Sequence, residues 1–312
     1  MTKESTVSIA AWSALVLALL AVLAPLAVLV HDHRRTVAPS TEAARALRHA
    51  TLPAAVATAV LLLGVLGVAT WVTAGVPALP VRPDGRAVAC APIAAALAFL
   101  LVHAVGELTY PRPSGDVRTA DLTTRTVADV APRPLRVLTW SWAGALVTLL
   151  AAGTLTATGP RHLDRVVDGW ISRGTPYLGS WYAVPLTVGV VVLLAATAGV
   201  LHLVATRPAV GGVGPGWDLA LRRRTGARIL RGVQLALALT LAGALLMTSW
   251  TLHRVAEPIP TLTPATAVPE VAVLAQLVLV VAVSVGVAGT AVALRRGAAH
   301  PRTVTADVAA VA

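Results

Sequence analysis

The stretch YAVPLTVGVVVLLAATAGVLHLVAT, residues 182–206, contains no Asp, Glu, Lys or Arg and decides the fold class. A run of about 20 apolar residues is what a helix needs to cross a hydrocarbon core of roughly 30 Å. Backbone polar groups in lipid must be hydrogen-bonded within their own segment, so this run predicts a transmembrane helix. A transmembrane β-strand would alternate apolar and polar residues, and Val190–Ala195 does not alternate.

Six further runs of the same kind lie along the chain, at 8–30, 53–75, 87–107, 137–158, 229–252 and 270–294. We therefore predict an all-α fold: a polytopic transmembrane helical bundle with seven spans. It forms a single integral membrane domain over residues 1–312, with a flexible cytoplasmic tail at 299–312. The composition agrees, because only 12% of residues are charged, against about 25% in ordinary soluble domains.

The basic residues predict the orientation of this bundle. Most of the 25 Lys and Arg residues fall after the first, third and fifth spans and in the tail, which the positive-inside rule assigns to the cytoplasm. The first run is long for a signal peptide and is followed by the basic segment His31–Arg35, so we interpret it as an uncleaved anchor. We expect the N-terminus outside, the C-terminus in the cytoplasm, and location in the plasma membrane.

The net charge of +11 would suggest nucleic acid in a soluble protein. Here the basic residues are accounted for by topology, so we expect the lipid bilayer as the partner and no nucleic acid. A membrane or cytoplasmic protein partner stays open.

The loop after the fourth span has a helical repeat of apolar residues. Pro160 suits the first position of a helix, and the apolar side chains that follow recur as they would on one helical face. They belong to Leu163, Val166, Val167, Trp170 and Ile171. This spacing predicts a short amphipathic helix that lies on the outer membrane surface or caps the bundle.

The loop after the fifth span is rich in glycine over 211–216 and then carries three consecutive arginines. A glycine-rich turn before a helix can bind phosphate, but this one follows a membrane helix and has no Walker lysine. We therefore interpret it as a flexible linker that leads into a short helix. Arg222, Arg223 and Arg224 of that helix are predicted to contact anionic lipid headgroups.

Two loops also share a short pattern. Before the fourth span, Arg112–Pro113 is followed by Asp121–Leu122 and Arg125. Before the sixth span, Arg207–Pro208 is followed by Asp218–Leu219 and Arg222. The match suits a repeated two-helix hairpin, as in some transporters. A chance match accounts for so few residues equally well.

The sequence offers little chemistry inside the membrane. The centres of the seven runs contain no Asp, Glu, Lys or Arg, which argues against a proton-coupled carrier or an ion pump. The single cysteine, Cys90, excludes an intramolecular disulfide and a cysteine-based zinc site. Catalytic motifs of hydrolases and metalloproteases are missing, so we expect no catalytic residue, no metal site and no established cofactor.

Three functions stay open on these grounds. The first is a non-enzymatic membrane component, either permease-like or the partner of another protein. The second is a haem- or quinone-binding subunit that uses His103 and His202, which lie at similar depth in two spans; both could equally be histidines hydrogen-bonded near the headgroup boundary. The third is a membrane enzyme that acts on a lipid at the cytoplasmic face, where Glu107, Asp121 and Asp218 gather with the arginines.

Overall fold

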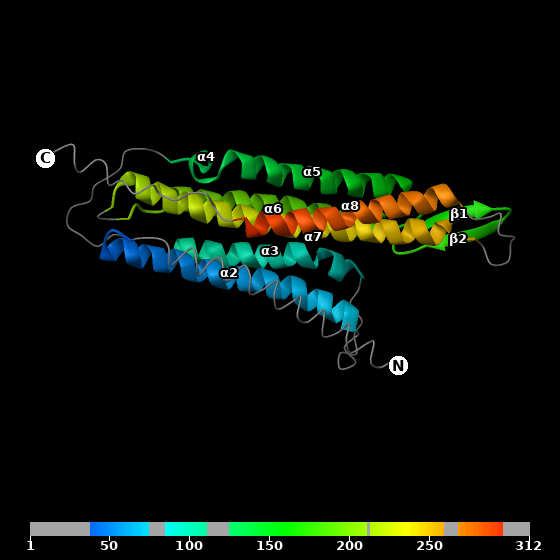
Figure 1. The fold of residues 1–312 in the computed structure, drawn as a ribbon, viewed down its shortest axis with the longest axis horizontal. Coiled ribbons are helices and arrows are strands. Elements are labelled where there is room, and N and C mark those ends of the chain that lie inside the picture. The colour runs from blue at the N-terminus through cyan, green and yellow to red at the C-terminus, as the bar shows by residue number, and fades with distance from the viewer. Residues whose placement is uncertain (1–37, 75–84, 111–124, 211–212, 259–267, 296–312) are drawn as a thin grey trace.

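The computed structural model describes residues 38–74, 85–110, 125–210, 213–258 and 268–295. In this part of the chain, six helices are long and apolar enough to cross a membrane (Figure 1). They are α2 (Thr41–Ala74), α3 (Gly85–Leu108), α5 (Arg133–Thr156), α6 (Ser180–Thr206), α7 (Pro215–Ala256) and α8 (Pro269–Leu294). A short helix α4 (Val127–Val130) precedes α5, and the strands β1 (Leu163–Val167) and β2 (Trp170–Gly174) lie between α5 and α6. The protein is thus a predominantly helical, multi-pass membrane protein.

Six of the seven predicted spans coincide with these helices. The predicted first span, 8–30, and the predicted tail, 299–312, lie outside the described residues. The seven-span count and the orientation of the termini therefore stay predictions.

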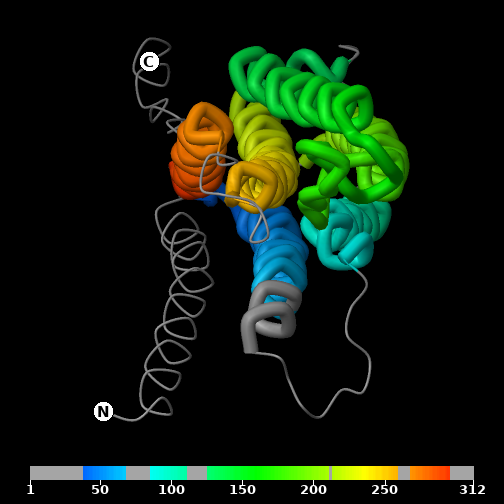
Figure 2. The backbone as a smooth tube through the Cα atoms, turned by 90° about the vertical axis from the view of Figure 1, so that its right-hand side faces the viewer, coloured from blue at the N-terminus to red at the C-terminus, as the bar shows by residue number. Residues whose placement is uncertain are grey.

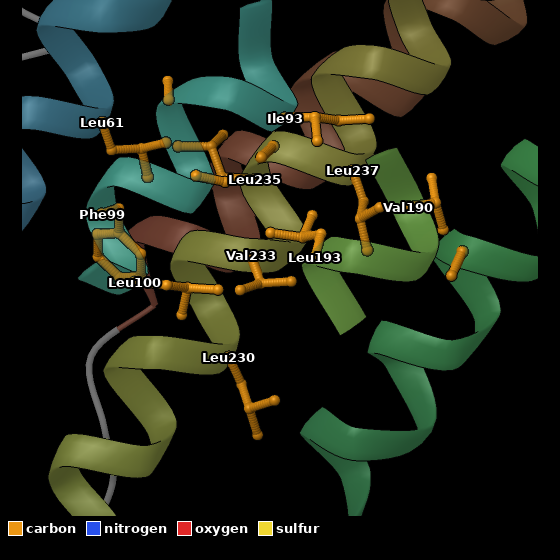
Figure 3. Packing of buried hydrophobic residues seen from close by; sticks show 14 of the residues in the cluster. Leu61, Ile93, Phe99, Leu100, Val190, Leu193, Leu230, Val233, Leu235 and Leu237 are labelled. Atoms are coloured by element: carbon orange, nitrogen blue, oxygen red, sulfur yellow. The ribbon is translucent and has the colours of Figure 1, made fainter. Parts of the chain in front are cut away.

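Helix α7 is the centre of the bundle, and Figure 2 shows α5, α6, α3, α2 and α8 arranged around it. In its most apolar stretch 67% of the residues are buried, against 11% for α8. Ile229, Val233, Ala236 and Leu237 of α7 are 0% exposed. They pack against apolar side chains of α3 and α6 (Figure 3), and this filled layer is the hydrophobic core.

Helix α8 packs chiefly on α7 and does so through small residues. Its buried residues are Ala275, Ala282 and Gly289, spaced seven apart. A Cβ atom on Gly289 would overlap the Cβ atom of Ala238 on α7. Small residues let transmembrane helices approach closely and gain van der Waals contact, so this stripe explains how α8 is held.

The predicted amphipathic helix after the fourth span is wrong, because these residues form an antiparallel β-hairpin. Val166 pairs with Ile171 and Val167 with Trp170, and the turn between them has positive φ at Asp168 (49°) and Gly169 (80°). Asp-Gly is a preferred dipeptide for a two-residue turn in which both residues have positive φ. The turn chemistry therefore outweighs the helical spacing of the apolar residues.

The arginine-rich segment 218–224 is also not a separate short helix. It belongs to α7, which begins at Pro215 and continues without interruption for 42 residues. At 1.5 Å per residue such a helix is about 63 Å long, roughly twice the thickness of a hydrocarbon core. At least one end of α7 must consequently extend beyond the apolar layer.

Candidate functional site

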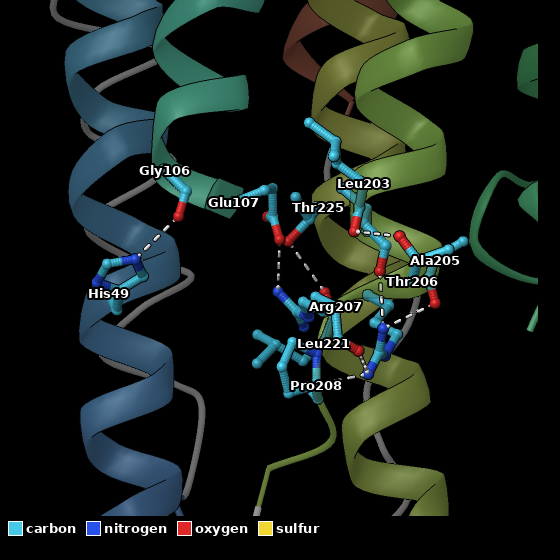
Figure 4. A network of polar contacts seen from close by, with 12 residues as sticks. His49, Gly106, Glu107, Leu203, Ala205, Thr206, Arg207, Pro208, Leu221 and Thr225 are labelled. Atoms are coloured by element: carbon cyan, nitrogen blue, oxygen red, sulfur yellow. Dashed lines mark hydrogen bonds and ion pairs between the residues drawn. The ribbon is translucent and has the colours of Figure 1, made fainter. Parts of the chain in front are cut away.

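The end of α3, the end of α6 and the start of α7 lie at the same end of the bundle and bring buried charged residues together (Figures 1 and 4). We call this group the charge cluster. It consists of Glu107, Tyr110, Arg125, Arg207, Asp218 and Arg222. The side chain of Arg207 is 1% exposed and those of Asp218 and Arg222 are 2% exposed, so these charges must be satisfied within the protein.

Arg222 is the best-satisfied member of the cluster. Its Nε donates to Asp218 Oδ2 at 2.8 Å. Its Nη1 and Nη2 donate to four backbone carbonyls at the end of α6, those of Val204, Ala205, Arg207 and Pro208, at 2.8–3.2 Å. The last carbonyls of a helix lack intrahelical donors, and a cation is favourable there. Arg222 is therefore a structural cap that ties α7 to α6.

Asp218 links two parts of the chain. It accepts hydrogen bonds from Arg222, one helical turn further along α7, and from Nη1 of Arg125 in the segment before α4. Arg125 and Arg222 are the matching arginines of the repeated sequence pattern, and both meet the same carboxylate. Both guanidinium groups bind Oδ2 of Asp218, and its Oδ1 is buried without a hydrogen-bond partner.

Arg207 differs from Arg222 because much of its donor capacity is unused. Its Nη1 lies 3.5 Å from Glu107 Oε2 (Figure 4), and its Cζ lies 4.5 Å from the centre of the Tyr110 ring. Nε and Nη2 of Arg207 are buried and have no hydrogen-bond partner, and the same holds for the Tyr110 hydroxyl. At this corner of the cluster, three buried hydrogen-bond donors thus have no acceptor among the described residues.

Tyr110 is held in place from the other side by α2. Its ring packs edge-on against His49 with ring centroids 5.4 Å apart, and His49 Nε2 is hydrogen-bonded to the Gly106 carbonyl at 2.9 Å. Burial raises the pKa of the Tyr110 hydroxyl above its ordinary value, with the Arg207 charge acting in the opposite direction. The phenol therefore keeps its proton at neutral pH.

A groove runs along α2 next to His49. It has a volume of about 620 Å³ and is lined by Arg45, Arg48, His49, Thr51, Leu52 and Ala55. Arg45 and Arg48 are exposed. The groove thus combines basic groups near the start of α2 with apolar side chains one turn further on.

The opposite end of the bundle also carries polar structure, at the base of the hairpin. A pocket of about 520 Å³ is lined by Pro160, Arg161, His162, Arg173, Thr175 and Trp181. The Arg86 guanidinium stacks on Trp181 at 4.0 Å, and Arg173 binds both carboxylate oxygens of Asp164 at 2.8 and 2.9 Å. The Arg173 hydrogen bonds are the main reason that the pKa of Asp164 lies below its usual range.

The residues proposed for a cofactor have different surroundings. His103 is 3% exposed, and its ring packs edge-on against Phe99 at 4.7 Å, whereas His202 is exposed on the surface of α6. A haem held by two histidines needs both rings in one space, so this arrangement gives the pair no support and the cofactor role stays a prediction. Among the described residues, no group of three His, Cys, Asp or Glu could hold a metal ion.

The three consecutive arginines also differ in burial and in hydrogen-bond partners. Arg222 is buried and its donors are used inside the protein, whereas Arg223 is exposed and donates through Nε to the Asp129 carbonyl at 2.9 Å. Arg224 is half-buried. Contact with lipid headgroups stays a prediction for Arg223 and Arg224, and Asp121 lies outside the described residues.

Sequence reasoning singled out Glu107, Asp218 and Arg222, placed Arg207 only in the repeated loop pattern, and missed Tyr110. Arg207 directly follows a span, where an arginine is ordinarily read as a topology signal. No local pattern distinguishes a buried guanidinium from a solvated one, so only the packing of α3 against α6 and α7 identifies it.

In the part of the chain that the structure describes, these features define an integral membrane protein with a mostly apolar core along α7 and a buried charge cluster at one end. Comparison with known proteins adds nothing to this description, because no family model, no curated protein and no solved structure matches the chain. The function is therefore argued from the geometry of the chain itself.

Proposed function

We propose that this protein is a non-enzymatic membrane component that serves another membrane protein and does not conduct a solute through its own bundle. The observation that carries the proposal is the filled interior along α7. Val233 and Leu237 at its centre are 0% exposed, and the neighbouring Gln234 is engaged by α5, with its Nε2 donating to the Leu135 carbonyl and Thr139 Oγ1 at 2.7 and 3.0 Å. A permease needs a polar or hollow path at this depth.

The pairing of the carboxylates favours a non-enzymatic role. Glu107 and Asp218 are the acidic groups of the charge cluster, and each faces at least one arginine. A general base must be able to reach a substrate proton and must have a pKa near the working pH. Carboxylates that are buried and face guanidinium groups are poorly placed to reach a substrate proton.

The accessibility of engineered cysteines tests whether the interior is closed. In a Cys90→Ala background, Val233→Cys and Leu237→Cys are expected to resist a membrane-impermeant maleimide in vesicles of both orientations. Ile171→Cys in the hairpin, which is 59% exposed, is the positive control and is expected to react from one side. Labelling of either interior cysteine from water would contradict the closed bundle and favour a permease.

A partner role predicts protein contact at an exposed apolar face. Helix α8 is the best candidate because it packs chiefly on α7 and leaves Leu277, Val280 and Val287 at 59–65% exposure. A photocrosslinking residue at Val280 in intact cells is expected to capture a transmembrane helix of another protein. The same probe at Leu155 on α5, 85% exposed, is the lipid-facing control, and lipid adducts alone at both positions would contradict a partner on α8.

A further inference from the structure

The buried donors of Arg207 need an acceptor. A buried polar group without a partner costs about 1–3 kcal/mol, and more when it is charged. Such groups are rare in native proteins and call for an explanation, which includes an ion or a water. Arg207 leaves two nitrogens, Nε and Nη2, without a partner at 1% side-chain exposure. The neighbouring carbonyls do not fill this need, because Arg222 already uses those at the end of α6.

The ion pairs of the cluster leave Arg207 with the least negative charge. Among the described residues, Arg125 and Arg222 both bind Asp218, which Arg207 does not contact as an ion pair. Among the described residues, Glu107 is the single ion-pair partner of Arg207, at 3.5 Å. An anion next to Arg207 would pair the donors that Glu107 leaves unused, and burial strongly favours paired charges.

Tyr110 supplies a second donor at the same place. Its ring lies against the Arg207 guanidinium at 4.5 Å, and its buried hydroxyl has no partner. An arginine stacked on an aromatic face has its donors directed in advance. His49 of α2 packs edge-on against the ring, so packing fixes the positions of the Arg207 and Tyr110 donors.

The geometry of the donors selects the class of anion. The edge of a guanidinium group that carries Nε and one Nη matches two oxygens of a phosphate or carboxylate. The groove on α2 is lined by His49, whose ring packs on Tyr110, whereas Tyr110 and Arg207 themselves do not line it. Its exposed Arg45 and Arg48 add positive charge, and Leu52 and Ala55 add apolar surface. Basic groups next to an apolar wall suit a phosphate that is carried by a lipid or that arrives free from the cytoplasm.

We propose that Arg207 and Tyr110 form a binding site for a phosphate group, with Arg207 as the bidentate donor and Tyr110 as the hydroxyl donor. The phosphate is that of an anionic phospholipid headgroup or of inorganic phosphate. The site is independent of the proposed partner role.

Binding by the purified full-length protein tests this proposal in two arms. In uncharged detergent, inorganic phosphate is titrated and the midpoint of thermal unfolding is followed. In nanodiscs of phosphatidylcholine with added phosphatidylglycerol, the lipid that stays bound after purification is identified by mass spectrometry. Stabilisation in the first arm, retention of phosphatidylglycerol in the second, or both, supports the site and identifies the source. The absence of both overturns it.

The variants are chosen so that the fold survives. Tyr110→Phe keeps the ring and removes one donor, and we expect binding about tenfold weaker. The double variant Arg207→Gln with Glu107→Gln removes a buried ion pair without changing the net charge, and we expect it to abolish binding. Arg133→Gln, at an exposed arginine at the start of α5, is the control and should bind like the parent. If Tyr110→Phe and the double variant both bind like the parent, the site is elsewhere and the proposal fails.

Glu107→Gln alone gives a test of the opposite sign. This variant removes the negative charge that competes for Arg207 and leaves the guanidinium in place. We expect it to bind phosphate more tightly than the parent by about tenfold. Weaker binding would mean that Glu107 itself contributes to the site, which contradicts the assignment of Arg207 as the unneutralised donor.

Discussion

The buried arginines at the charge cluster show two ways to satisfy a guanidinium group away from water. Arg222 does so with one carboxylate and four backbone carbonyls, and it thereby closes the open end of α6. Arg207 has a single carboxylate at 3.5 Å and an aromatic face. Removing charge from water has a large penalty that only complete pairing offsets. Arg222 is accordingly a residue for stability, and Arg207 is the donor of the proposed phosphate site.

Arg222→Gln is expected to lower the free energy of unfolding by about 3–5 kcal/mol, because it leaves carbonyls of α6 without donors and weakens the hold on Asp218. Unfolding of the purified protein in detergent micelles measures the loss. Arg223→Gln removes the same charge from the next position, which is exposed, and we expect a change of less than about 1 kcal/mol. Equal losses in the two variants would refute the assignment of Arg222 as the cap.

The sequence could not separate these arginines. Arg222, Arg223 and Arg224 are consecutive, so each points about 100° away from the last on the helix, and composition says nothing about which one faces inward. The inward direction depends on the end of α6, which is 15 or more residues away in the chain and meets α7 only after folding. By contrast, the predicted Asp218–Arg222 spacing is local, since residues four apart share a helix face, and this pair forms as i, i+4.

At the scale of elements, long apolar runs located the described spans, whereas apolar periodicity predicted a helix where the hairpin forms. Long runs such as 182–206 have no competing structure in lipid, which is why their helices agree with expectation. The spacing of the apolar residues in the hairpin suits a helix as well as a two-stranded ribbon. These residues are Val166, Val167, Trp170 and Ile171. The Asp168–Gly169 dipeptide decides between the two, because its backbone has positive φ at both positions.

The hairpin is expected to depend on pH through Asp164. The hydrogen bonds from Arg173 lower the pKa of this carboxyl, and His162 at 3.7 Å acts in the same direction. A carboxyl whose pKa is lower in the folded state contributes stability above its ordinary pKa, and this contribution is lost as the pH falls through the lowered value. Amide hydrogen exchange in β1 and β2, corrected for intrinsic rates, should therefore show less protection in strong acid than at neutral pH.

Asp164→Asn should reduce the protection of the hairpin at neutral pH and remove most of this pH dependence. Asp168→Asn is the matched control, because asparagine also tolerates the positive φ of the turn. Its hairpin should keep the protection and the pH response of the parent. A pH response that persists in Asp164→Asn would assign it to another group.

The contact between α4 and α7 predicts a difference between two glycines on the same helix. A Cβ atom at Gly226 would overlap the Val130 carbonyl of α4, whereas Gly243 has nothing within 4 Å of that position. Gly226→Ala should therefore destabilise the protein by about 1–3 kcal/mol. Gly243→Ala should be neutral or stabilise it by up to about 1 kcal/mol, because alanine favours the helix. Unfolding in micelles measures both, and equal effects would contradict the close approach of α4.

At the scale of the whole molecule, the six described helices alternate in direction. The starts of α2, α5 and α7 lie at one end of the bundle with the ends of α3 and α6, the hairpin lies at the other, and α8 runs from the hairpin end back along α7 (Figure 1). Hydropathy predicted this arrangement because adjacent spans must cross the bilayer in opposite directions. The charge cluster was beyond such a prediction, since it depends on how three helix ends pack and not on where each of them begins.

Because the helices alternate in direction, either the charge-cluster end or the hairpin end faces the cytoplasm. One pair of engineered cysteines can decide between these two orientations. In a Cys90→Ala background, Arg223→Cys places a thiol at the charge-cluster end and Ile171→Cys places one in the hairpin, and both positions are exposed. The excess of arginine at the first of these ends predicts that it is cytoplasmic. Ile171→Cys should thus react with a membrane-impermeant maleimide in intact cells, and Arg223→Cys only after permeabilisation. The reverse pattern would place the charge cluster outside, where inorganic phosphate and inner-leaflet lipids of the cytoplasm cannot reach Arg207. The orientation therefore decides which phosphate sources the proposed site can meet in the cell, whereas binding by the purified protein does not depend on it.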